Sequence, residues 1–403
     1  MDKQFHDLFS SDARNFRPSA IRAFARLIND PNIISFAGGV PSPATFPVEL
    51  VARCADTVIR TRSSIALQYG PTPGLPRLRD SIASISRSRG IECAAEDVMV
   101  TTGSQQALDL VAHVLLDPGD VVLVELPTYI GASSSFYARS AELAGVCQDD
   151  EGIVPEDLRA VLARLKKDGK NAKFLYTIPN FQNPSGRVMK RERRAEVNSI
   201  AAEAGIIVVE DDPYGEVKFD PSTDTTPIKA LGESAHVVYL GSFSKVLAPG
   251  LRCGWILADP LLLRMFELAK EAADLCSGML DQSIVDELCA SGDLPSQIER
   301  VREFYRARCG VLMDALQARF AGRATWTQST GGLFTFLTLN DRVDTREWVR
   351  RSIDAGVAYV PGAPFFVDGS GLETMRLTFA KEPDDRLREG IDRLARVFLD
   401  REG

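Results

Sequence analysis

A single lysine stands among small residues in the stretch YLGSFSKVLAPGLRCGW, residues 239–255. Lys245 comes just after an apolar run, with Ser242 and Ser244 beside it and Arg252 seven positions further on. A lysine on a solvated helix would have charged neighbours instead. An amine that is buried near a cation loses its proton more readily, and the neutral amine is the form that attacks a carbonyl carbon. The stretch therefore indicates a lysine with a chemical role.

Polar residues also follow four other short apolar runs, at the points where those runs end. These residues are Gly103, Ser104, Gln105, Tyr129, Asn180, Asn183, Asp211 and Tyr214. In an open α/β sheet, ligands bind at the carboxyl ends of the strands. If the runs are strands, we expect an anion site, an aromatic ring, an amide, a carboxylate and Lys245 to meet at one edge of the sheet.

Pyridoxal phosphate is a cofactor that needs this combination of groups. A lysine forms a Schiff base with its aldehyde, and a carboxylate keeps its ring nitrogen protonated, so that the ring accepts electrons. Its phosphate binds to backbone N–H groups at the start of a helix and to a cation, and its flat ring stacks on an aromatic side chain. By spacing alone, Asp211 and Asp212 compete for the place beside the ring nitrogen.

Alternating strands and helices are predicted to position these residues. The predicted strands cover residues 97–103, 120–127, 173–180, 205–212 and 236–242, and predicted helices cover 104–116 and 190–205. Such alternation is typical of a mostly parallel sheet that is covered by helices on both faces. The sequence therefore predicts an α/β domain.

The pattern changes after about residue 290. A long helix at 296–320, strand-like runs at 331–339 and 375–380, and a helix near 345–356 predict a smaller α+β domain. Residues 1–40 have the character of an arm with a helix at 18–28. We predict an N-terminal arm and helix (1–40), a large cofactor-binding domain (41–290) and a small C-terminal domain (291–403).

Composition excludes several other classes of protein. The 403 residues carry a net charge of −8, which disfavours a nucleic-acid partner. No apolar run approaches the ~20 residues that a membrane span needs, and the polar N-terminus lacks the apolar core that is expected of a signal peptide. The seven cysteines are scattered without a CxxC pair, as expected for reduced thiols in the cytoplasm. Three histidines without metal-ligand spacing give little support to a zinc site or a Ser-His-Asp hydrolase.

Ten short motifs occur in order between about residues 33 and 380. They are SFAGGVPSPATFP, LQYGPTPGLPRLR, TTGSQQALDLV, ELPTYIGA, YTIPNFQNPSG, VEDDPYGEV, GSFSKVLAPGLRCGW, GGLFTFLTL, PGAPFF and RLTFA. With these motifs the chain resembles the class I and II aminotransferases, which are pyridoxal-phosphate enzymes of fold type I. Within that group it resembles the branch of 2-aminoadipate and kynurenine aminotransferases.

The resemblance implies a role for each residue around the cofactor ring. Lys245 would hold the cofactor covalently and move a proton once substrate displaces it. Asp211, rather than Asp212, would pair with the ring nitrogen. Asn183 and Tyr214 would hydrogen-bond the phenolic oxygen. The remaining cofactor residues would be Tyr129, stacked on the ring, and Ser104, Gln105, Ser242, Ser244 and Arg252, around the phosphate.

The resemblance also implies how substrate is bound. Arg376 would hold the substrate α-carboxylate in a two-pronged salt bridge, with Asn183 and Gly39 beside it. Tyr69 would reach across a dimer interface into the partner's site. Arg22, on the N-terminal helix, would meet the distal carboxylate of a dicarboxylic substrate.

The function implied is that of a cytoplasmic, homodimeric aminotransferase with a ping-pong mechanism. It would move an amino group from a 2-aminoadipate-, aromatic- or glutamate-like L-amino acid to a 2-oxo acid such as 2-oxoglutarate or pyruvate. The motifs leave open a lyase, decarboxylase or cyclase that uses the same cofactor. A ligand-sensing transcription factor with this domain behind a winged helix is disfavoured, because the motifs begin by about residue 33 and the charge is acidic.

Overall fold

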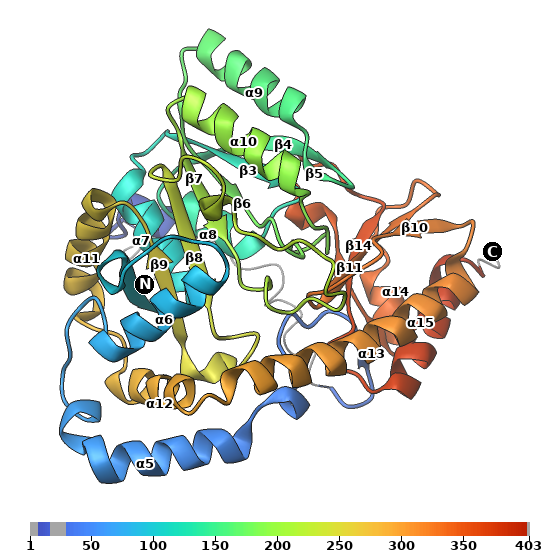
Figure 1. Ribbon diagram of the computed structural model, residues 1–403. Coiled ribbons are helices and arrows are strands. Elements are labelled where there is room, and N and C mark those ends of the chain that lie inside the picture. Colours follow the sequence, from blue (N-terminus) through green and yellow to red (C-terminus); the bar gives the residue numbers. More distant parts are fainter. Residues whose placement is uncertain (1–6, 17–29, 401–403) are drawn as a thin grey trace.

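An eight-stranded sheet forms the centre of the larger part of the molecule (Figure 1). The computed structural model describes residues 7–16 and 30–400. In spatial order the strands are β2 (Val98–Thr102), β9 (Cys253–Leu257), β8 (Val237–Ser242), β7 (Ile207–Asp211), β6 (Ala172–Thr177), β3 (Val121–Leu126), β4 (Glu142–Asp149) and β5 (Gly152–Ile153). Runs rich in valine, leucine and isoleucine form its central strands because branched side chains suit a pleated, buried surface.

Most neighbouring strands of this sheet run parallel, and the exceptions lie toward its ends. Strands β8, β7, β6, β3 and β4 pair in parallel, whereas β9 lies antiparallel between β2 and β8. All five predicted strands are present. Strand β9, which the sequence analysis did not predict, contains the end of the lysine motif. Its antiparallel course returns the chain after Lys245 along β8.

The two faces of the sheet bury different sets of side chains. Val121, Leu123, Leu175 and Val208 belong to a cluster that is covered by helices α9 and α10. Their sequence neighbours, such as Val122 and Phe174, belong to the main core on the other face. This alternation follows from the strand period of two residues. The predicted α/β fold with helices on both faces is confirmed.

Helices make up most of the rest of the large part. They are α2 (Ser11–Asn15), α5 (Val48–Ala66), α6 (Pro76–Ser88), α7 (Ser104–Leu115), α8 (Ile130–Ala138), α9 (Pro155–Lys167), α10 (Arg191–Glu203), α11 (Pro260–Asp274) and α12 (Met279–Ala290). Helix α9 shows how the sequence sets such an element. It begins with proline at its first position, has Glu156 and Asp157 in its first turn, and ends with basic residues, an order that matches the helix dipole.

The smaller part contains an antiparallel sheet, drawn in orange and red at the right of Figure 1. Its strands, in order, are β10 (Ala324–Trp326), β11 (Phe334–Leu339), β14 (Thr374–Thr378) and β13 (Val360–Pro361). Its helices are α13 (Leu294–Phe320), α14 (Val349–Asp354) and α15 (Asp384–Phe398). Strand β1 (Ile34–Ser35) pairs in parallel with β12 (Val357–Ala358), so residues 34–35 join this part.

The long helix α13 runs from α12, in the lower part of the view, to the small sheet at the right (Figure 1). The α+β character expected after residue 290 is therefore present. The predicted domain limits at residues 40 and 290 stay a prediction. None of the helices in the described part of the chain has the length and apolar content that a membrane crossing requires.

Candidate active site

Lys245 lies in the loop that follows β8, at the carboxyl edge of the large sheet. Strand β8 is buried throughout and ends at Ser242, whose hydroxyl accepts a hydrogen bond from the Ser244 amide at 3.1 Å. The Lys245 amine lies 5.7 Å from the centre of the Tyr214 ring. Because a fully paired strand and a hydrogen-bonded turn precede it, the lysine backbone is held rigidly.

The loop ends in a short 3₁₀ turn, Pro249–Leu251, that brings Arg252 back toward the sheet. Arg252 has φ = 45°, in the left-handed region that non-glycine residues rarely adopt. Its guanidinium donates to the carbonyl oxygens of Thr102, at 3.1 Å, and Pro249, at 3.3 Å. The guanidinium thereby lies at the end of β2, where helix α7 begins.

The start of α7 has a backbone that only glycine fits closely. Gly103 has φ = 73°, and a Cβ there would lie 2.6 Å from Arg252 Nη2. A Cβ on Gly254 would lie 2.9 Å from the Ser104 amide nitrogen. Free amide groups at a helix start, with a guanidinium beside them, bind anions. A cavity of about 410 Å³ that Gln105 and Arg252 help to line opens at this point.

The two adjacent carboxylates Asp211 and Asp212 have different surroundings. Asp211 is the last residue of β7 and is 3% exposed. Its Oδ2 accepts a hydrogen bond from the Tyr176 hydroxyl at 2.8 Å, while its Oδ1 is buried with no partner in the described chain. Burial raises the pKa of Asp211 to about 7, although the bond from Tyr176 and the charge of Lys245 act in the opposite direction.

Asp212 is already fully hydrogen-bonded by the protein. Its Oδ1 accepts from the Asn180 side-chain amide and the Gly215 amide, both at 3.0 Å. Its Oδ2 accepts from the Tyr239 hydroxyl at 3.2 Å and lies 2.6 Å from Arg89 Nη1. Of the two carboxylates, Asp211 is therefore the one with an oxygen left for a ligand.

Tyr214 and Asn183 meet beside Lys245. Tyr214 is buried, and the Asn183 side chain hydrogen-bonds its hydroxyl. Burial raises the pKa of Tyr214 well above its ordinary value, so the hydroxyl stays protonated near neutral pH. Tyr129, at the start of α8, is close enough to act on the charge of the Tyr214 hydroxyl. The structure thus brings the predicted ring-binding residues together.

Arg376 enters the same site from the small sheet. Its Nη1 donates to Asn183 Oδ1 at 2.9 Å and its Nη2 to the Ala37 carbonyl at 3.0 Å. The guanidinium lies 4.4 Å from the centre of the Phe334 ring, and its Nε has no hydrogen-bond partner in residues 7–16 and 30–400. Burial lowers the pKa of Arg376 to about 10, so the side chain remains charged at neutral pH. A buried cation with free hydrogen-bonding capacity suits a carboxylate ligand.

The charges of the site act together on Lys245. Burial lowers the pKa of its amine to about 8. Asp211 works against this shift, while the positive charges of Arg376 and Arg252 lower the pKa further. A sizeable fraction of the amine is therefore neutral near physiological pH.

Four predicted residues lie outside this close group or touch only its rim. The Gln105 side chain is exposed and donates to Ser135 of α8 at 2.9 Å. Gly39 lies beside Arg376, since a Cβ there would be 3.5 Å from Nη2. Tyr69, just beyond α5, is 79% exposed. Arg22 lies outside the described residues.

Comparisons with known proteins bear on the whole chain. The model of the family "Aminotransferase class I and II" matches residues 32–394. The chain is 41% identical to aromatic-amino-acid aminotransferase 1 of Thermococcus litoralis over 98% of its length and 94% of the relative's. It is 38% identical to 2-aminoadipate transaminase of Thermus thermophilus, over 97% and 96% of the two chains.

A solved structure agrees with these relatives. Kynurenine aminotransferase of Pyrococcus horikoshii, in complex with PMP and KYN as substrates and KYA as products, is 40% identical. It superposes with a TM-score of 0.93 over 98% of this chain and 97% of the other. The chain belongs to the class I and II aminotransferases.

Family, fold type I architecture and aminotransferase activity are therefore confirmed, as is the pyridoxal-phosphate cofactor. Among the alternatives, the comparisons support transamination over a lyase, decarboxylase or cyclase. Aminotransferases use amino acids and 2-oxo acids as substrates, and this defines the small-molecule partners of the enzyme.

The residues of the aminotransferase fit pyridoxal phosphate. The orphan Oδ1 of Asp211 is a buried acceptor that a protonated ring nitrogen would satisfy. The glycine-lined start of α7, with Arg252 against it, fits a phosphate. In the sequence, Lys245 lies between Asp211 and Arg252, and the charges of both residues act on its amine.

Sequence reasoning did not find two residues that support the site. Tyr176 bonds Asp211, and its signal was a lone tyrosine inside the otherwise apolar run of β6. Arg89 pairs with Asp212, and no local pattern marks it, because its partner is more than a hundred residues away.

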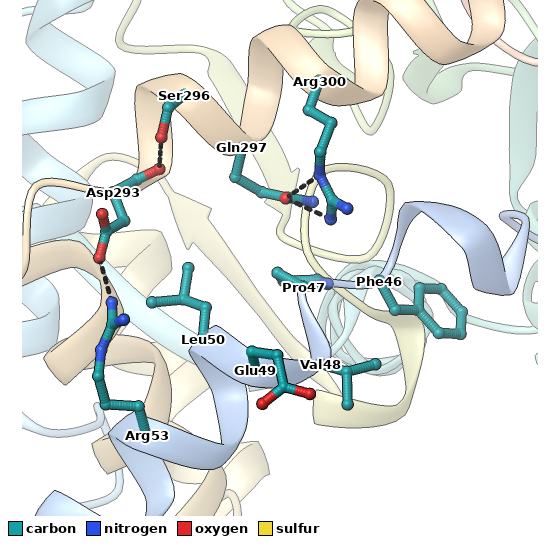
Figure 2. Close-up of a pocket in the computed structure, with 10 residues that line it drawn as sticks. All are labelled: Phe46, Pro47, Val48, Glu49, Leu50, Arg53, Asp293, Ser296, Gln297 and Arg300. Atoms are coloured by element: carbon teal, nitrogen blue, oxygen red, sulfur yellow. Dashed lines mark hydrogen bonds and ion pairs between the residues drawn. The ribbon is translucent and has the colours of Figure 1, made fainter.

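Figure 2 shows a different cavity, of about 530 Å³, between the starts of α5 and α13. Arg53 pairs with Asp293 on one wall, and Arg300 bonds Gln297 on another. The other residues that line it are Phe46, Pro47, Val48, Glu49, Leu50 and Ser296. Within residues 7–16 and 30–400, none of the predicted site residues lines this cavity.

Proposed function

We propose that this aminotransferase takes the amino group from aromatic, kynurenine-like or 2-aminoadipate-like L-amino acids and passes it to a 2-oxo acid such as 2-oxoglutarate or pyruvate. Relatives named for aromatic amino acids, 2-aminoadipate and kynurenine support this range. The observation that carries the proposal is Arg376, a buried guanidinium with free hydrogen-bonding capacity that is close enough to Lys245 to lower its pKa.

Lys245 and Asp211 have the central roles in this proposal. When bound, pyridoxal phosphate supplies an aldehyde carbon that accepts the amino group and a protonated ring that stabilises negative charge at the substrate Cα. Lys245 Nζ would hold the cofactor covalently and then move the proton at the substrate Cα. Asp211 Oδ1 would accept the hydrogen bond of the ring nitrogen, a role for which Asp212 has no free oxygen.

Other side chains would orient the cofactor. Tyr214 and the Asn183 amide would donate to its phenolic oxygen, and Tyr129 would stack on its ring. The phosphate would be held by the start of α7 and by side chains around it, namely Ser104, Gln105, Ser242, Ser244 and Arg252.

Substrate would bind through Arg376. Two parallel hydrogen bonds from its guanidinium match the planar α-carboxylate, which a lysine would not reproduce. Asn183 holds Nη1 in the free enzyme and would share that group with the substrate. Gly39 leaves room beside Nη2. Arg22 remains our proposal for a distal carboxylate.

The assembly is part of the proposal. Tyr69 is exposed in one chain, as expected if it completes the site of a partner in a homodimer. The cytoplasmic location also stays a proposal, and the seven free thiols are consistent with it.

A spectral half-reaction screen tests the function. The yellow enzyme, loaded with pyridoxal phosphate, is mixed with single L-amino acids, and the absorption of the cofactor is followed until it reaches the band of its amine form. Aromatic amino acids, kynurenine and 2-aminoadipate should give complete conversion and one equivalent of 2-oxo acid. Release of ammonia or CO₂ in place of the 2-oxo acid would contradict transamination.

A further inference from the structure

Arg89 connects the end of α6 to the segment that carries Asp211 and Tyr214. It follows α6 directly, and its side chain is only 10% exposed. Its Nη1 lies 2.6 Å from Asp212 Oδ2 and donates to the Tyr239 hydroxyl at 2.8 Å. Its Nη2 donates to the Thr225 carbonyl at 2.9 Å. One side chain thus ties together α6, β8 and the loops after β7.

The Asp212 carboxylate is the centre of these bonds. Its side chain is completely buried and has four donors, from Asn180, Gly215, Tyr239 and Arg89. A carboxylate has about four lone-pair sites, so this one is saturated. Of the four donors, the Arg89 guanidinium is the one that carries charge, and a buried carboxylate needs such a partner.

Charged groups from other elements surround this pair. Glu216, two residues after Tyr214, lies 3.4 Å from Arg89 Nε and 3.0 Å from Arg302 of α13. Arg194 of α10 donates to Asn180, which in turn donates to Asp212. Glu210 of β7 is also near enough to influence the same charge. The segment 211–216 is therefore fixed from several sides through charged hydrogen bonds.

Asp211 and Asp212 are consecutive, so the position of one constrains the other. Successive side chains of a strand point to opposite faces. Asp212 is drawn to the Arg89 side, and Asp211 consequently faces Tyr176, Lys245 and its own unsatisfied oxygen. Tyr214 comes two residues after Asp212 in the same segment, so the contacts of Asp212 also help to place Tyr214.

We infer that Arg89 is a positioning residue for the transamination reaction: by holding the Asp212 carboxylate, it aims Asp211 and Tyr214 at the cofactor. This inference rests on the proposed roles of Asp211 and Tyr214. Without the guanidinium, the Asp212 carboxylate would be buried with no cation, and the segment would move to hydrate it.

The test compares Arg89→Gln, Arg89→Lys and the double variant Arg89→Gln/Asp212→Asn. Titration of the apoenzyme with pyridoxal phosphate and thermal unfolding of the apoenzyme are measured at pH 8. We expect Arg89→Gln to weaken cofactor binding about tenfold or more, with a matching loss of apoenzyme stability. Arg89→Lys and the double variant should stay within about threefold of the wild type.

Arg87→Gln is the matched control, because Arg87 lies in the last turn of α6 close to Arg89, is exposed, and donates to the Cys93 carbonyl. If Arg89→Gln behaves like this control, or loses binding without rescue in Arg89→Lys and the double variant, the inference is wrong. If Arg89→Gln does not fold, failure of the double variant to bind the cofactor overturns the inference equally. Asp211→Asn is measured in parallel. Normal turnover in that variant would refute the proposed role of Asp211 whatever Arg89 does.

Discussion

At the scale of single residues, the site depends on which polar atoms the protein leaves free. Asp211 and Asp212 have the same side chain and adjacent positions, yet Asp212 is saturated by four donors, whereas Asp211 has a buried oxygen with no partner among the described residues. An unsatisfied buried acceptor costs about 1–3 kcal/mol. A bound cofactor with a protonated ring nitrogen would remove that cost. Binding of the cofactor at Asp211 should therefore stabilise the folded protein.

The Asp211→Asn variant should bind pyridoxal phosphate but lose turnover by about 100-fold or more, because a neutral amide does not hold the ring nitrogen protonated. Steady-state rates and cofactor absorption measure the two effects separately. Asp220→Asn, an exposed aspartate in the following loop, should leave both unchanged. Near-normal turnover in Asp211→Asn would show that this carboxylate is not the partner of the ring.

Lys245 should determine both the site at which the cofactor attaches and the pH range in which attachment is fast. Its lowered pKa of about 8 means that the amine is mainly protonated, and not nucleophilic, at lower pH. The rate of covalent attachment of pyridoxal phosphate to the apoenzyme should therefore rise about tenfold for each unit by which the pH increases toward 8. Above pH 8 the rate should level off. Stopped-flow absorption at several pH values gives this profile.

Borohydride reduction and peptide mass mapping should find the attached cofactor on Lys245. Lys245→Ala should bind it only non-covalently and lose transamination by several orders of magnitude. Lys190→Ala, which changes an exposed lysine paired with Glu151, is the control. Recovery of the reduced cofactor on another lysine would overturn the assignment of the site.

At the scale of elements, close backbone approach builds the anion site. Helix α7 begins where β2 and β9 lie side by side, and glycines at 103 and 254 let the helix start, the sheet and Arg252 come into contact. Most of the binding capacity for phosphate comes from backbone amides, whose positions depend on these glycines.

Gly103→Ala should weaken binding of pyridoxal phosphate by about tenfold or more. The new Cβ would lie 2.6 Å from Arg252 Nη2 and would displace the guanidinium. Gly119→Ala separates this effect from backbone strain, since Gly119 also has a positive φ, of 90°, but has nothing within 4 Å of a new Cβ. Both variants should lose about 1–2 kcal/mol of stability, and only the first should lose cofactor affinity. Equal affinity in the two variants would refute the close-contact explanation.

At the scale of the whole molecule, exposed apolar side chains gather on and after two helices. Ile59, Ile65, Leu67 and Tyr69 belong to α5 and the residues after it, and Leu261, Met265 and Leu268 belong to α11. Exposed apolar surface of this kind is typical of an interface. An isologous dimer would bury it and would place Tyr69 of each chain near the other chain's site.

Mixing two inactive variants tests whether the site is shared. Lys245→Ala and Tyr69→Ala dimers should each be weakly active or inactive. If Tyr69 serves the partner's site, a mixed dimer contains one site with both native residues. After dissociation and reassociation, random pairing should then restore about a quarter of the wild-type activity. Sedimentation should show a dimer of the 44.1 kDa chain. Absence of any recovery, or a fully active monomer, would contradict the shared site.

The sequence by itself was sufficient for the large fold and for bringing most of the predicted site residues to one edge of the sheet. Five central strands are present where the apolar runs predicted them, and β2, β3, β6, β7 and β8 are each followed within a few residues by predicted site residues. Strand ends and the residues after them are local features, so a parallel sheet brings them to one edge whatever the details of packing. The roles of these residues remain predictions, and Arg22 lies outside the described residues.

The family resemblance favoured Asp211 over Asp212, but only the tertiary structure showed the physical difference between them. It also placed β9 between β2 and β8, and brought Arg376 to Asn183 from 193 residues away. It revealed Tyr176 and Arg89 as partners of the two carboxylates. Local patterns carry no information on these contacts, because each contact joins groups that are far apart in the sequence. Removal of water costs free energy for both groups and strengthens the hydrogen bond between them, and both effects arise only when the complete fold has closed over them.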